Sequence, residues 1–125
     1  MIEKIFILLI AFQFKHLIAD YYLQFPYMYE NKGKAVGWAK PLFDHAATHS
    51  FLTMAIVATV TLDPLVSVLA MLFDFTTHFA IDRWKATRGH HPGESKFWTD
   101  LGIDQMLHHI VGIIIIGGIY YGTVY

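Results

Sequence analysis

Cysteine is absent from the 125 residues of this chain, which excludes disulfide bonds and thiolate metal ligands. Charged residues are scarce at 15%, against roughly 25% in soluble domains. The formal net charge of −1 gives no indication of a nucleic-acid partner. In contrast, 55% of the residues are hydrophobic, 16% are aromatic and the mean hydropathy is +0.43. This balance favours a chain whose main solvent is lipid.

Proline is absent from the interior of four long apolar stretches, each approaching the roughly 20 residues that span a bilayer as a helix. The stretches cover approximately residues 2–25, 42–62, 64–84 and 97–122. The prolines are at the edges of these stretches or between them, where proline ends or begins a helix. We therefore expect a single all-α membrane domain over residues 1–125, folded as a four-helix transmembrane bundle with up-down topology.

The connections between the stretches differ in character. Residues 26–40 are polar and are expected to hold a short interfacial helix, whereas the glycines and proline of residues 86–96 predict a loop. Asp63 directly precedes Pro64 and is a candidate cap for the third long helix. The apolar run at the N-terminus lacks a small-residue cleavage site, so we interpret it as a retained helix rather than a signal peptide.

Charge and glycine placement predict how the bundle is oriented and how it associates. Most of the nine lysines and arginines lie in the first and third connections, and the positive-inside rule puts that side in the cytoplasm and both termini outside. Gly118 and Gly122 have the small-xxx-small spacing of close helix packing, although glycines there could equally loosen the last helix. The same pair is a candidate face for a homo-oligomer.

Aspartates and histidines recur four residues apart in every predicted helix. The sets are His16/Asp20, His45/His49, Asp74/His78/Asp82 and Asp104/His108. This spacing puts the side chains of each set one turn apart on one helical face. The sets come late in the first and third helices and early in the second and fourth, so up-down topology predicts that all of them share one layer near the cytoplasmic side.

Such a polar layer needs compensation, because a charge at the centre of a bilayer costs about 2.5–3.5 kcal/mol on insertion scales. Divalent cations would compensate best, since one ion satisfies several carboxylates. The candidate metal ligands are His16, Asp20, His45, His49, Asp74, His78, Asp82, Asp104 and His108. So many donors suit two ions, or one ion surrounded by supporting Asp–His pairs. Imidazole and carboxylate ligands fit Zn, Mn or Fe better than Cu(I). A polar network that fixes helix register is the alternative without a metal.

A metal in this layer would activate a bound water and polarise a phosphoryl or carbonyl oxygen. Asp20 or Asp82 could then act as the catalytic general base. A substrate carried by membrane lipid could reach the layer from the level of the head groups. We therefore predict an intramembrane metal-dependent hydrolase that acts on a membrane-resident ester or phosphoester.

Two other classes of function stay open from the sequence. The Asp–His ladder could be the relay of a proton or metal-ion transporter, although the outer half of the helices offers few polar groups beyond Thr53, Thr59, Thr61 and Ser67. The chain could also be a non-enzymatic phage accessory protein in which a metal only holds the fold.

Several of these motifs resemble known families. The segments 15–24, 74–85 and 104–108 resemble an uncharacterised family of small bacterial and phage membrane proteins, catalogued as a domain of unknown function, and the likeness spans nearly the whole chain. The segment from His45 to Ser50 is similar to the His-x3-His-Ser element of the inner-membrane metal-dependent hydrolases linked to the LexA regulon, with Ala46 where that family carries arginine. The second resemblance implies a metal-dependent hydrolase in the bacterial inner membrane.

Overall fold

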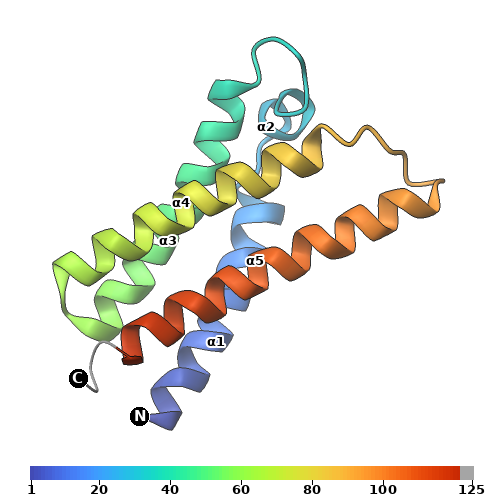
Figure 1. Ribbon diagram of the computed structural model, residues 1–125. Helices are drawn as coiled ribbons and strands as arrows, with labels where there is room; N and C mark the ends of the chain where they lie inside the picture. The colour runs from blue at the N-terminus through green and yellow to red at the C-terminus, as the bar shows by residue number, and fades with distance from the viewer. Residues whose placement is uncertain (122–125) are drawn as a thin grey trace.

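The chain folds as an all-α protein in the computed structural model, which describes residues 1–121 and contains no strand among them. The elements are α1 (Ile2–Leu17), η1 (Ile18–Tyr22), α2 (Pro26–Asn31), α3 (Ala39–Thr61), α4 (Pro64–Ala86) and α5 (Ser95–Tyr121). The long helices alternate in direction (Figure 1). The N-terminus, the α3–α4 turn and the end of α5 therefore lie at one end of the molecule, and the α2–α3 and α4–α5 connections at the other. Each predicted stretch corresponds to a helix, with its ends shifted by a turn or less.

The first helix departs from the prediction at its C-terminal end. α1 passes into η1, a π-helix in which the Leu23 amide donates to the Ile18 carbonyl oxygen at 3.0 Å. Phe25 then adopts extended geometry, because α conformation is disfavoured for the residue before a proline. The helix consequently ends at Tyr22 rather than near residue 25. η1 carries Asp20, so this widened turn sets the position of one candidate ligand.

The predicted connections are largely confirmed. The Asp63 carboxylate accepts hydrogen bonds from the amides of Leu65 and Val66, as a helix cap does. Residues 26–40 contain the short helix α2, which begins at Pro26, and residues 87–94 lie outside any helix. Both polar connections therefore lie at the same end of the bundle.

The interior divides into an apolar half and a polar half. At the end with the N-terminus, the buried apolar cluster consists of Leu8, Phe12, Val57, Ala70, Val111, Ile115, Ile116 and Ile119. α1 and α5 approach closely at Gly112, where an added Cβ would lie 3.1 Å from a ring carbon of Phe12. An added Cβ on Gly118 would meet no atom within 4 Å among the described residues, so no close helix contact depends on this glycine there, and Gly122 lies outside the described residues. The polar half of the interior lies toward the two polar connections.

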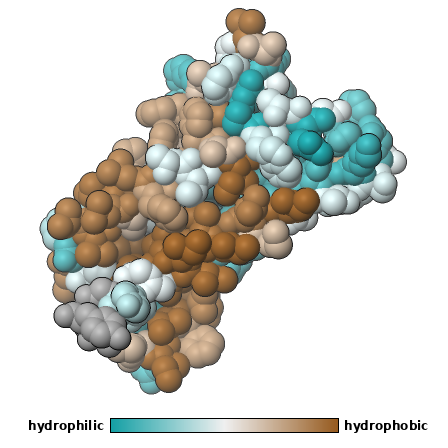
Figure 2. Space-filling model, viewed as in Figure 1, coloured by the Kyte–Doolittle hydropathy of each residue, from teal (hydrophilic) through white to brown (hydrophobic). Residues whose placement is uncertain are grey.

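The outer surface of the bundle is largely apolar. Large outward-facing apolar side chains occur on every long helix and include Ile10, Phe14, Phe51, Leu69, Leu72, Ile113 and Ile114. Figure 2 shows this apolar surface over the body of the bundle and the hydrophilic surface at the polar connections. Two helices, α4 and α5, are long and apolar enough to cross a membrane by length and composition. The α-helical part of α1 has only 16 residues. Of the predicted four-helix transmembrane bundle, the structure shows the all-α character and two helices of sufficient length and hydropathy.

Candidate metal centre

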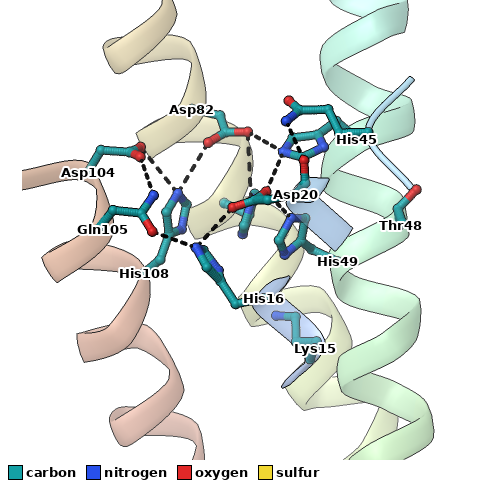
Figure 3. Close-up of polar contacts among 12 residues, drawn as sticks. Lys15, His16, Asp20, His45, Thr48, His49, Asp82, Asp104, Gln105 and His108 are labelled. Carbon is teal, nitrogen blue, oxygen red and sulfur yellow. Dashed lines mark hydrogen bonds and ion pairs between the residues drawn. The ribbon is translucent and has the colours of Figure 1, made fainter. Parts of the chain in front are cut away.

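Aspartate and histidine side chains from every long helix meet in the polar half of the interior (Figure 3). They are His16 from α1, Asp20 from η1, His45 and His49 from α3, His78 and Asp82 from α4, and Asp104 and His108 from α5. The four-residue spacing turns the members of each pair toward the interior on successive turns of helix. The residues predicted to share one polar layer, apart from Asp74, therefore contact one another in the structure.

The first group of possible ligands combines η1, α3 and α4. Asp20, His45, His49 and His78 each offer one ligand atom, and these atoms lie within 4.8 Å of one another. One carboxylate oxygen of Asp20 is 2.9 Å from Nε2 of His49 and 3.4 Å from Nε2 of His45. The rings of His49 and His78 stack with their centroids 3.7 Å apart. Three imidazoles and one carboxylate are a ligand set that suits a tetrahedral divalent ion.

The second group overlaps the first. His78, Asp82 and His108 also offer ligand atoms within 4.8 Å of one another. One carboxylate oxygen of Asp82 is 3.2 Å from Nε2 of His108, and the other is 2.9 Å from Nε2 of His45. Because His78 belongs to both groups, the geometry allows either one ion or two ions that share this neighbourhood.

Several buried polar atoms of the cluster have no hydrogen-bond partner among the described residues. They are Nε2 of His78, Nδ1 of His45 and Nδ1 of His49. A buried polar atom without a partner costs free energy. His78 belongs to both groups, so a cation bound through its Nε2 would satisfy that atom. The Nδ1 atoms of His45 and His49 would not gain a partner if Nε2 were the ligand atom.

His16 and Asp104 lie beside the two groups rather than within them. Nε2 of His16 is 2.9 Å from Asp20 and also 2.9 Å from the side-chain oxygen of Gln105. Gln105 donates in turn to Asp104 at 2.9 Å, and Asp104 lies 3.3 Å from Nε2 of His108. This arrangement orients Asp20 and His108, as residues around a metal ligand commonly do. Gln105 was not predicted from the sequence, where its one signal is its position next to Asp104.

The structure does not bring Asp74 together with the histidines. Its carboxylate lies 2.7 Å from Nζ of Lys15 and accepts a hydrogen bond from the Thr53 hydroxyl at 2.6 Å. Lys15 and Asp74 are both buried, and a buried ammonium group competes strongly for a carboxylate. An acidic partner for Lys15 was predictable from the sequence, since a lysine inside an apolar helix needs a partner.

A polar cavity with a volume of about 580 Å³ opens next to the cluster. Its lining includes Asp20, Asp82 and Asp104 on the side of the cluster and Lys32, Lys34 and Lys85 around them. We call this cavity the vestibule. It connects the carboxylates of the candidate centre with the polar end of the bundle.

Comparison with known proteins identifies one family. A family model described as "Protein of unknown function (DUF3307)" matches residues 5–123. No curated protein and no solved structure gives a significant match. The match covers nearly the whole chain, including all the aspartates and histidines of the cluster.

Proposed function

The chain belongs to the DUF3307 family, and we propose that it is a membrane-embedded metal-dependent hydrolase of a lipid ester or phosphoester. The observation that carries this proposal is the pair of overlapping His/Asp groups, each able to hold a metal ion, beside an open polar cavity. Asp20 and Asp82 belong to these groups and also line the vestibule. A substrate in the vestibule would therefore meet the candidate catalytic carboxylates.

The distribution of side chains supports a membrane location. Charged and polar groups are buried inside the bundle, whereas large apolar side chains cover its outside. A soluble protein would have the reverse pattern over most of its surface. We propose that all four long helices cross the inner membrane of a bacterium, with the basic connections in the cytoplasm and the N-terminus outside.

The ligand types support zinc first, with manganese or iron as alternatives. In the first group Asp20, His45, His49 and His78 would hold one ion, and Asp82 and His108 would contribute to a second, with His78 ligating only one of the two. His16, Gln105 and Asp104 would hold the ligands in orientation. A metal so bound supplies Lewis acidity toward an ester oxygen and an activated water.

The chain's own carboxylates would handle the proton of the reaction. The oxygen of a water forms a bond to the phosphorus or carbonyl carbon of the substrate, and one water proton passes to Asp20 or Asp82. The bond from that phosphorus or carbon to the ester oxygen then breaks, and the leaving oxygen takes up the proton. The products are an alcohol and a phosphate, or an alcohol and a carboxylic acid.

The test is hydrolysis by purified protein in mixed micelles, with lipid phosphomonoesters, phosphodiesters and carboxyl esters offered separately. We expect turnover of at least one class, its loss after chelation of metals, and its recovery when zinc or manganese is restored. The variant His78→Ala should lose the activity, whereas His91→Ala, an exposed loop histidine outside both groups, should keep it. Absence of turnover by metal-loaded wild-type protein on all three classes would refute the proposal.

A transporter is the second candidate, because the Lys15–Asp74 pair extends the polar interior one turn beyond His78. Buried apolar side chains around Leu8, Val57 and Ile115 form the next part of the bundle, where an ion would be unfavourable. Ion flux into proteoliposomes that is abolished by Asp74→Asn would favour transport. A non-enzymatic role would be favoured if Asp20→Asn kept its fold, its metal and its biological activity.

A further inference from the structure

We propose that the vestibule binds the phosphate group of an anionic lipid, so that the substrate is a phosphate-bearing lipid rather than a neutral ester. This inference rests on the proposed hydrolase function and specifies its substrate class. Three lysines, Lys32, Lys34 and Lys85, are among the residues that line one cavity beside the carboxylates of the candidate centre. A tetrahedral phosphate carries up to two negative charges and several acceptor oxygens, and it matches such a set of donors.

Lys32 lies closest to the candidate centre. Its ammonium is half-buried, 3.3 Å from a carboxylate oxygen of Asp82 and 2.8 Å from the side-chain oxygen of Gln24. An ammonium group has three hydrogens to donate, so one remains for a ligand in the vestibule. A phosphate oxygen bound to Lys32 would therefore lie next to Asp82, where the ester bond would be cleaved.

The segment that carries Lys32 and Lys34 is held firmly against α4. The guanidinium of Arg83 donates to the backbone oxygens of Lys32 and Lys34 at 2.9 Å and 3.2 Å, and it lies 4.0 Å from the centre of the Trp38 ring. A Cβ on Gly33 would lie 2.6 Å from the Ala86 backbone oxygen, so only glycine allows this approach. The backbone that carries the two lysines is thus fixed by its contacts with α4.

The positive-inside rule does not explain why three lysines line the same cavity. A positive-inside signal requires basic residues only on one side of the membrane, and Lys40 and Lys96 provide it without lining the vestibule. Glu30 is the acidic residue of the vestibule outside the candidate centre, and with Asp20, Asp82 and Asp104 the lining holds four carboxylates and three lysines. Metal bound by the carboxylates of the candidate centre would leave the three lysines opposite Glu30 alone, and this metal-loaded vestibule would favour an anionic ligand.

A lipid source for the phosphate agrees with the surroundings of the vestibule. Its lining includes Leu101 and Tyr21, and Tyr21 is 78% exposed on the outside of η1. An acyl chain could therefore leave the cavity along the apolar outer surface of the bundle. The volume of about 580 Å³ accommodates a head group.

The experiment measures binding to purified metal-loaded protein of decylphosphonate, whose carbon–phosphorus bond is not an ester and is not hydrolysed. Decanol serves as the neutral probe and methylphosphonate as the soluble one. We expect Lys32→Gln to weaken decylphosphonate binding by about tenfold or more, as expected for loss of a charged hydrogen bond. Lys34→Gln should have a smaller effect because its side chain is exposed. Lys32→Arg should restore binding, and Lys96→Gln should behave as wild type.

Each outcome bears directly on the inference. Equal binding of decylphosphonate by wild type and Lys32→Gln, or equal binding of decanol and decylphosphonate by wild type, would overturn it. Methylphosphonate binding as tightly as decylphosphonate would overturn the lipid source. Phosphonate binding that depends on Lys32 in a protein without any hydrolytic activity would support the phosphate subsite and refute the proposed function. Hydrolysis of neutral esters with an unchanged KM in Lys32→Gln would support the proposed function and refute the phosphate subsite.

Discussion

Replacing Lys15 with methionine removes the ammonium that faces the Asp74 carboxylate at 2.7 Å. The two side chains are only 5% and 4% exposed, so the variant leaves a carboxylate buried with the Thr53 hydroxyl as its remaining partner. Removing one member of a buried ion pair costs about 3–5 kcal/mol. We expect a loss of that size in the free energy of unfolding for Lys15→Met and for Asp74→Asn.

The double variant Lys15→Met/Asp74→Asn removes both charges together. Its loss should be smaller than the sum of the two single losses by about 2 kcal/mol, because neither charge is then left alone. Unfolding by sodium dodecyl sulfate in mixed micelles, followed by circular dichroism, measures these differences. Lys4→Met is the matched control, since Lys4 is an exposed lysine on the same helix.

Two results would refute this reasoning. If the losses in the double variant are additive, Lys15 and Asp74 are not energetically coupled. If Lys15→Met loses no more stability than Lys4→Met, the Lys15 ammonium is not buried in an ion pair. Metal content tests independently whether Asp74 is a metal ligand. If Asp74 serves Lys15, the double variant keeps its metal, whereas the sequence-based assignment of Asp74 as a ligand requires metal to be lost.

Three further predictions concern the ends of the helices. Gly33→Ala should lower the free energy of unfolding by about 1–3 kcal/mol through overpacking against Ala86, whereas Gly93→Ala, which meets no atom, should not; thermal unfolding of both variants checks this. Asp63→Ala should cost about 0.5–2 kcal/mol by removing the α4 cap, and an unchanged unfolding midpoint in denaturant would contradict the cap. The backbone amide of His91, and then the His90 side chain, hold the pKa of Glu94 below its ordinary value. Glu94 therefore stabilises the fold at pH values above its ordinary pKa, and this contribution is lost as the pH falls through the lowered pKa. The free energies of unfolding of Glu94→Gln and wild type should accordingly converge in acid and differ near neutral pH.

The helices were predictable because their signals are local. Apolar runs, edge prolines and the Asp63 cap are read directly from neighbouring residues, and all of them correspond to the helices observed. The π-helical turn at Ile18–Tyr22 was not predictable, because nothing in its composition distinguishes it from a continuing α-helix.

The cluster was predictable in outline and not in its pairings. The spacing of His45 and His49, or of His78 and Asp82, fixes which face each residue occupies. It does not fix which carboxylate meets which cation. Asp74 has the same spacing from His78 as Asp82 has, yet Asp74 lies against Lys15. Only the relative placement of α1 and α4 decides between these partners.

Elemental analysis of protein purified in mild detergent, without added metal or chelator, tests the central claim most directly. The overlapping His/Asp groups predict at least one transition-metal ion per chain in the wild type. They also predict its loss in His78→Ala, which removes the residue common to both groups, and its retention in His91→Ala. A wild-type protein without bound transition metal, or equal metal content in the two variants, would contradict the account.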